Sequence, residues 1–326
     1  MKPLHLGVLI CLASAPVMAQ PGQKWQPGFS GDISLLAGFT QTTSQFNTDN
    51  QTTSSLLQPG EKKTEALIAP LGSLHYTFDG ADKQLFFGTS RSDVALGRFH
   101  VELGYRQSLQ QNGMLSISYV PGLLSQNTWQ DPYIENQPRK ETDSSIQGLR
   151  FQYEKILGSD FSVEVAAGQQ KIDDEKSGQE YFTPQEQALL ERESNILYLQ
   201  GAYRHTISAK RFLRSAVNYT RIDADGKAMA SHIYGAEIGL VQLLPSSSFA
   251  LTLSYDRARF DDDNPVFDQR QMDDRWRAFL AYAYNKPFGW KNWGLVSLIG
   301  YSDSNSTISF YDEKSLVMTV GVNYVF

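Results

Sequence analysis

Hydrophobic and polar residues alternate along most of the chain beyond residue 28, with the two-residue period that is typical of β-strands. The pattern is clearest at the end of the chain, where the apolar positions include Leu316, Met318, Val320 and Val322, and Ser315, Thr319 and Gly321 alternate with them. A tilted strand needs about 9–11 residues to cross a bilayer. Most of the alternating segments have about this length, which favours membrane strands over those of a soluble sandwich.

The alternation predicts about fourteen strands, with twelve or sixteen as the alternatives. The predicted strands are 29–40, 65–78, 83–90, 98–107, 114–120, 145–156, 161–172, 195–206, 211–222, 231–243, 249–259, 274–284, 293–302 and 314–326. Every second connection between them is short. The others are mostly long and polar, at 41–64, 121–144, 173–194, 223–230, 260–273 and 303–313, with 91–97 as a short exception. Bacterial outer-membrane barrels have short periplasmic turns and long external loops.

These features predict an all-β fold, a transmembrane antiparallel up-and-down β-barrel in the outer membrane with both termini in the periplasm. Hydrocarbon offers no hydrogen-bond partners, so such a sheet must close on itself. With fourteen strands the interior is wider than side chains alone fill. It can therefore be an aqueous channel unless a connection folds into it.

The first residues predict an export signal. Lys2 precedes an apolar run from Leu4 to Ala13, and Val17-Met18-Ala19 has the small residues of a cleavage site. We expect a signal peptide at residues 1–19, a periplasmic lead-in at 20–28 and the barrel at 29–326. Cys11 is the only cysteine, so the mature chain would carry no thiol.

Composition excludes some classes of function. The chain has 35 acidic and 29 basic residues and a net charge of −6, which argues against a nucleic-acid partner. Mean hydropathy is −0.36. Four histidines remain beyond the signal; His232 lies beside Ser231, but adjacent strand residues point to opposite faces, and His100 has no obvious serine beside it. We therefore expect no enzyme and no catalytic residue, and we also expect no cofactor and no metal.

Charged residues at interior positions are the main candidate site. Strand parity directs eleven of them toward the lumen, Glu154 included, and we predict that ten line a pore: Glu102, Arg106, Arg150, Glu164, Arg204, Arg214, Glu237, Asp256, Arg275 and Arg277. They would either set selectivity for small polar solutes or pair with one another and stiffen the barrel. The sequence leaves both interpretations open.

Two loop segments carry weaker signals. The run Asp261-Asp262-Asp263 has oxygen ligands for Ca²⁺ but lacks the spacing of a defined site, and a solvated acidic loop is the alternative. Thr183 and Pro184 form a helix start. The short helix would either constrict the lumen or pack on neighbouring loops.

The start of the barrel resembles a known family. Gly28-Phe29-Ser30-Gly31, followed by Gly38 and by Phe46-Asn47-Thr48-Asp49, is similar to an uncharacterised domain-of-unknown-function family of Gram-negative envelope proteins. This resemblance implies a barrel and supplies no substrate. Phe326, the final aromatic residue, stands in the position of the assembly signal that the barrel-assembly machinery reads in outer-membrane barrels.

Together these features favour a porin-like channel for passive diffusion of small hydrophilic solutes. The alternative is a plugged barrel with a structural or adhesion role through its outer loops. A third hypothesis, transport of a hydrophobic ligand, would require an apolar pocket inside a lumen whose lining reads as polar. The expected partners are outer-membrane lipid and lipopolysaccharide, the barrel-assembly machinery and small polar solutes.

Overall fold

The structure is a computed structural model that describes residues 25–90, 93–94, 96–122 and 126–326. The predicted signal peptide and most of the lead-in lie outside these residues. The strands are β1 Gly28–Thr43, β2 Lys62–Thr77, β3 Lys83–Gly88, β4 Glu102–Ser108, β5 Met114–Val120, β6 Gln126–Trp129, β7 Glu141–Glu154, β8 Phe161–Ile172, β9 Ser194–Ser208, β10 Arg211–Ala224, β11 Ser231–Leu243, β12 Ser247–Asn264, β13 Gln269–Asn285, β14 Trp293–Ser306 and β15 Glu313–Val325. The one described α-helix of more than one turn is α2, Pro184–Leu189. None of the described helices is long and apolar enough to cross a membrane.

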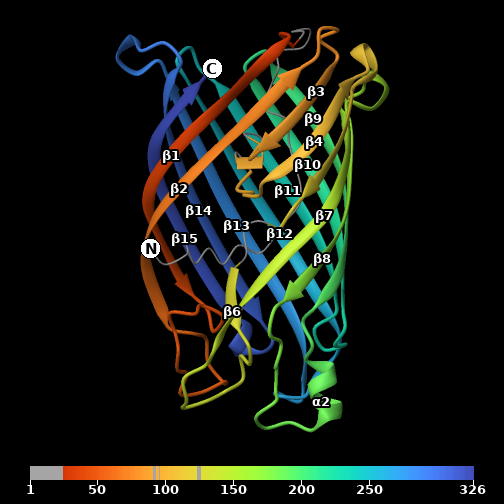
Figure 1. The fold of residues 1–326 in the computed structure, drawn as a ribbon, viewed down its shortest axis with the longest axis vertical. Helices are drawn as coiled ribbons and strands as arrows, with labels where there is room; N and C mark the ends of the chain where they lie inside the picture. The colour runs from red at the N-terminus through yellow and green to blue at the C-terminus, as the bar shows by residue number, and fades with distance from the viewer. Residues whose placement is uncertain (1–24, 91–92, 95, 123–125) are drawn as a thin grey trace.

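Apart from β6, the described strands form one closed antiparallel barrel of fourteen strands (Figure 1). Closure joins β5 to β7, where residues 114–120 pair with 148–154. The first and last strands also pair along most of their length. Phe326 completes that seam, because its backbone exchanges two hydrogen bonds with Gly31, of 2.9 and 3.0 Å. Because the sheet is closed, few backbone N–H and C=O groups are left without a hydrogen bond where they would face lipid, as a membrane requires.

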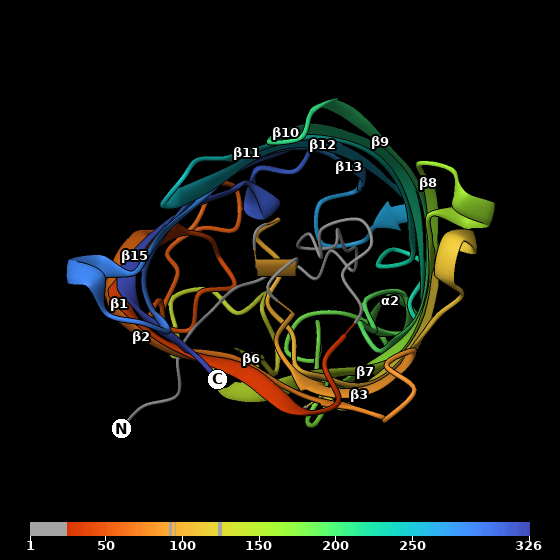
Figure 2. The same cartoon turned by 90° about the horizontal axis from the view of Figure 1, so that it is seen from above.

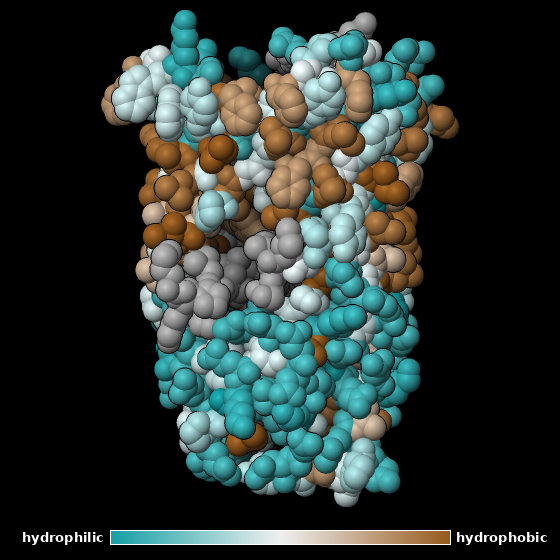
Figure 3. Space-filling model, in the orientation of Figure 1, coloured by the Kyte–Doolittle hydropathy of each residue, from teal (hydrophilic) through white to brown (hydrophobic). Residues whose placement is uncertain are grey.

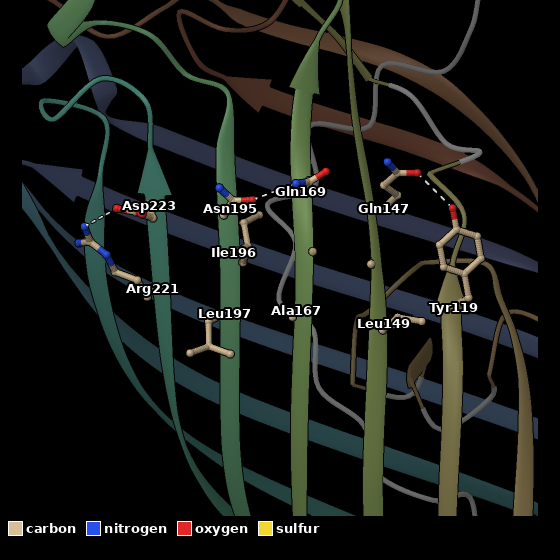
Figure 4. A pocket seen from close by; sticks show the side chains of 12 residues that line it. Tyr119, Gln147, Leu149, Ala167, Gln169, Asn195, Ile196, Leu197, Arg221 and Asp223 are labelled. Atoms are coloured by element: carbon tan, nitrogen blue, oxygen red, sulfur yellow. Dashed lines mark hydrogen bonds and ion pairs between the residues drawn. The ribbon is translucent and has the colours of Figure 1, made fainter.

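On the face seen in Figure 3, an apolar belt lies on the side of the short turns, which we call the turn end, while the opposite loop end is polar. Figure 4 shows part of the boundary on β7, β8 and β9, where outward side chains change from apolar to polar over two residues. The pairs are Leu149 and Gln147, Ala167 and Gln169, and Leu197 and Asn195. Polar members on neighbouring strands also bond to one another: Gln169 on β8 donates to Asn195 on β9 at 3.0 Å. This boundary marks one face of the bilayer.

The loops share a hydrophobic core, which we call the loop core. Tyr133, Leu190, Ile308 and Phe310 are buried in it. Phe46, Leu56, Met229, Val266, Phe267 and Tyr311 pack against these four, so all six long loop-end connections contribute. The Tyr133 and Tyr311 hydroxyls lie 2.7 Å apart. Burial raises the pKa of Tyr133 to about 12. Because its members come from the whole circumference, the loop core lies across the mouth.

Three consecutive strands are too short to reach the loop end. β3, β4 and β5 have six, seven and seven residues, against twelve to eighteen for the other barrel strands. β3 ends at Gly88, whose φ of +118° and close approach to the Gly72 carbonyl exclude a side chain. There the chain turns inward, and the connection to β4 lies inside the ring of strands (Figure 2). We call residues 96–101 of this connection the inner segment.

The structure confirms the predicted fold and all fourteen predicted barrel strands, most of them with different ends. Strands 114–120, 161–172 and 231–243 have the predicted bounds, and β6 was missed. The prediction of a strand at 98–107 is wrong over its first four residues. Phe99 packs on Phe279 inside the barrel, with ring centroids 6.0 Å apart, instead of facing lipid. The described residues of the connection predicted at 91–97, residues 93–94 and 96–97, therefore belong to the inward fold.

The predicted helix start at Thr183 is present as a capping box with Glu186. Its helix lies at the loop end of the barrel (Figure 1), and Leu190, which follows it, belongs to the loop core. This matches the alternative in which the short helix packs on neighbouring loops. The acidic run also has protein partners, because Arg221 binds Asp261 through two nitrogens, at 3.0 and 2.7 Å.

Candidate solute pathway in the barrel interior

Arg150, an inward residue of β7, is the centre of the interior charges. It is 1% exposed. Its guanidinium binds three carboxylates: Glu164 at 2.9 Å, Asp93 at 3.1 Å and Glu102 at 3.3 Å. Asp93 receives a second bond, from Nη2, at 3.2 Å. A buried cation requires such partners. Through Asp93, Arg150 fixes the connection between β3 and β4 to the wall.

A second buried cluster holds the inner segment from the opposite side. Arg98 donates to Glu237 on β11 at 2.6 Å, across 139 residues of sequence. Arg214 on β10 binds the other oxygen of the same carboxylate, and it donates to Gln200 on β9 at 2.6 Å. The described connection is therefore tied to β7 by Asp93 and to β11 by Arg98, so it spans the lumen.

The remaining predicted residues also lie at inward or turn-end positions with protein partners. Arg106 donates to Gln84 at 2.6 Å, and Arg204 pairs with Asp160 at 3.2 Å near the turn end. Arg277 pairs with Asp256, whereas Arg275 donates a long hydrogen bond of 3.5 Å to Ser304. Seven of the ten, Glu102, Arg150, Glu164, Arg214, Glu237, Asp256 and Arg277, lie in ion pairs within the lumen. This pairing fits the stiffening interpretation of the interior charges.

Asp93, His100 and Glu102 place three possible metal ligands within 4.8 Å of one another. A cation already lies among them, because Nη1 of Arg150 is 3.1 Å from Asp93, 3.2 Å from His100 and 3.3 Å from Glu102. The guanidinium thus takes the position and the charge that a metal would have. The three groups therefore surround the side chain of Arg150 rather than a metal ion.

The lumen has an apolar side that the sequence analysis missed. Leu36, Phe279 and Leu298 form a buried cluster on β1, β13 and β14. Ala69 and Leu71 on β2, and Val94 and Phe99 of the β3–β4 connection, pack against it. A cavity of about 650 Å³ lies between this apolar wall and the charged residues. Arg98, Arg150, Glu237, Arg275 and Arg277 line its polar part.

This apolar wall overturns the expectation of a wholly polar lining. Inward positions of β12 and β13 do carry Asp256, Arg275 and Arg277, but Phe279 shares their face. The available signal was the inward parity of Leu36, Phe279 and Leu298. The contribution of Arg98 and Asp93 had no such signal, because neither residue lies on a strand.

Comparisons with known proteins identify one family and several distant solved structures. The family described as "Protein of unknown function (DUF2860)" matches residues 28–325. A search of curated proteins found no match. Among solved structures, a FadL homologue of Pseudomonas aeruginosa is 10% identical and covers 91% of this chain and 90% of its own, with a TM-score of 0.44.

Two further solved structures show the same level of similarity. The COG4313 outer membrane channel of Pseudomonas putida F1 is 11% identical, with 95% and 100% of the two chains covered and a TM-score of 0.40. OmpT, an outer membrane protein of Vibrio cholerae, is 10% identical, with 91% and 98% covered and a TM-score of 0.40. The closed barrel and its apolar belt are those of an outer-membrane protein.

Proposed function

Since the chain belongs to this family, whose description assigns no activity, we propose from the geometry that it is an outer-membrane channel for small solutes with two closures in series. The first closure is the loop core across the mouth, and the second is the inner segment across the lumen. Both termini and the short turns would face the periplasm, and the loops the outside. In this proposal the chain transports and does not catalyse.

The observation that carries the proposal is the inner segment itself. A barrel needs no covalent connection through its lumen for stability, because each strand is already paired on both sides. Here six residues leave the wall at the expense of three shortened strands, and buried ion pairs hold them across the lumen. An element held by a few specific contacts beside a cavity can act as a gate.

The solute class follows from the cavity. The sequence favoured small hydrophilic solutes, and the charged half of the cavity supports a polar group on the solute. The apolar wall of Leu36, Phe279 and Leu298 favours a solute that also has an apolar body.

A disulfide across the gate tests the proposal. A Cβ built on Gly97 lies 3.3 Å from the Cβ of Phe279, close to the 3.5–4.5 Å of a disulfide. The variant Gly97→Cys/Phe279→Cys is combined with Phe310→Ser, which opens the loop core. Planar-bilayer recordings should show steps under reducing conditions and none after oxidation. Phe310→Ser without cysteines, treated with the same oxidant, is the control.

The runner-up function is a plugged barrel that acts through its outer loops, in structure or adhesion. The packed loop core and the paired interior charges favour it. If the reduced triple variant and Phe310→Ser are both silent while folded, the channel proposal is rejected in favour of this role.

A further inference from the structure

One connection at the turn end has an unusual backbone conformation. It contains η2, Ile156–Gly158, which joins β7 to β8. Lys155, Leu157 and Gly158 have φ angles of +51°, +52° and +81°. Gly158 N donates to Lys155 O at 2.9 Å, which closes the turn. A side chain as large as that of leucine rarely adopts a positive φ, so the position of Leu157 requires an explanation.

A second connection repeats this conformation. It contains η3, Pro287–Gly289, which joins β13 to β14. Here Lys286, Phe288 and Gly289 have φ angles of +56°, +56° and +79°, and Gly289 N donates to Lys286 O at 3.0 Å. Both turns therefore have the order lysine, any residue, large apolar residue and glycine in one geometry. Figure 2 shows them outside the ring of strands on opposite sides of the barrel, η2 in yellow-green and η3 in blue.

The large apolar residues of the two turns, which we call the tips, are among the most exposed hydrophobic side chains in the described part of the chain. Leu157 is 77% exposed and Phe288 is 86% exposed. Positive φ in a turn does not require an apolar residue, because Ala81 and Gln110 have φ angles of +57° in two other turns at the same end. The tips therefore have large apolar side chains where small or polar ones would suffice. This indicates that the tips meet an apolar environment.

Aromatic rings connect η3 to the apolar belt. The ring centroids of Phe288 and Trp290 lie 5.5 Å apart, and those of Trp290 and Trp293 lie 6.5 Å apart. Trp293 in turn lies 5.1 Å from Tyr324. Trp293 and Tyr324 are outward residues of β14 and β15 and are 40% and 37% exposed. The row of rings thus continues the lipid-facing surface to the tip, as expected at the interface of a bilayer.

Each tip follows a cation in the sequence. Lys155 and Lys286 precede the tips by two residues, and Lys291 lies exposed beyond η3. Residues 155–159 and 286–293 contain no acidic residue. A lysine can place its ammonium group among lipid phosphates while its aliphatic part lies along an apolar surface. A cation beside an exposed apolar side chain is therefore complementary to the headgroup layer of a phospholipid leaflet.

We propose that η2 and η3 are two anchors that bind the phospholipid headgroup layer at the turn end. The tips Leu157 and Phe288 insert below the phosphate groups, and the preceding lysines contact those phosphates. Because the anchors lie on opposite sides of the barrel, together they fix its depth in the bilayer and limit its tilt. The inference concerns membrane attachment and is independent of the proposed channel.

The position of the tips is tested by spin-label accessibility in nanodiscs of phosphatidylethanolamine and phosphatidylglycerol. Nitroxides at Leu157→Cys and at Phe288→Cys are measured in separate samples. Ile33→Cys, which faces lipid and is 60% exposed, gives the lipid reference, and Ser246→Cys in an exposed turn gives the aqueous reference. Both tip labels should collide with a water-soluble nickel chelate several-fold less often than the Ser246 label. Equal collision rates would place the tips in water, free for a protein partner, and would reject the lipid anchors.

The contribution of the anchors to stability is tested by urea unfolding in phospholipid vesicles. Leu157→Ser/Phe288→Ser should unfold at a lower urea concentration than the wild type. Leu57→Ser is the matched control, because Leu57 is 80% exposed at the polar loop end and should give no shift. An unchanged midpoint in the double variant, or an equal shift in the control, overturns the proposal.

The role of the lysines is tested in the same assay with two lipids. The wild type should be more stable in phosphatidylglycerol than in phosphatidylcholine vesicles, and Lys155→Gln/Lys286→Gln should lose most of this difference. A double variant that keeps the full difference rejects the contact with phosphate.

Discussion

Replacing Asp93 with asparagine should weaken the attachment of the inner segment to β7, while Arg150 keeps its other two carboxylate partners. Asp93 is 1% exposed and accepts two bonds from the Arg150 guanidinium, at 3.1 and 3.2 Å. Asparagine has one acceptor oxygen, so one bond is lost and the other loses its anionic partner. Arg150 keeps Glu102 and Glu164, so no buried cation is left unpaired.

The size of the effect follows from these two bonds. A hydrogen bond to a charged group contributes roughly 1.5–3 kcal/mol and a neutral one about 1 kcal/mol. Asp93→Asn should therefore weaken the attachment of the inner segment by about 2 kcal/mol. Because about 1.4 kcal/mol corresponds to a factor of ten, the ratio of open to closed states should rise about 30-fold.

Single-channel recording in the Phe310→Ser background measures this ratio as open probability. Asp261→Asn is the matched control, since it weakens another bidentate arginine–aspartate pair that lies at the loop end and does not touch the inner segment. An open probability that is unchanged in Asp93→Asn, or raised equally by both substitutions, would refute the reasoning.

Four further outcomes are expected. Burial raises the pKa of Tyr133 to about 12 and raises that of Tyr311 well above its usual value, so both are neutral in the folded loops. Unfolded tyrosine ionises near 10, so the loop core should lose stability as pH rises from about 10 to 12, measured as loss of near-ultraviolet circular dichroism. Tyr133→Phe should reduce that loss. Gly88→Val places a Cβ 2.1 Å from a backbone oxygen and should prevent the heat-modifiable migration of a folded barrel. Phe310→Ser should cost the loop core about 3–4 kcal/mol, exposing the loops to protease while the barrel keeps that migration. Phe326→Ser should lower assembly in cells far more than refolding into detergent; an equal loss in both would indicate that Phe326 acts only through the seam with β1.

The fold was predictable because a membrane constrains every second residue of a strand. Residues 234–240 alternate without interruption, and the predicted bounds 231–243 match β11. The same rule failed at Phe99 and Val101, which alternate with His100 but belong to the inner segment. Alternation records that a residue meets an apolar surface, and here that surface is the apolar wall of the lumen rather than lipid.

The candidate site was predictable only in part. Parity placed Arg150 and Glu237 inside the barrel correctly, because each lies on a regular strand. Their partners Asp93 and Arg98 come from a non-repetitive connection, for which the sequence has no period to follow.

The motion of the inner segment is the central claim, and a distance measurement tests it most directly. Nitroxides at Leu96→Cys and at Ser246→Cys, in the turn between β11 and β12, can be compared by pulsed electron paramagnetic resonance in nanodiscs. We expect one main distance in the wild-type background and a second distance that grows when Asp93→Asn is added. A single, identical distance distribution in both proteins would contradict a gate built from this segment.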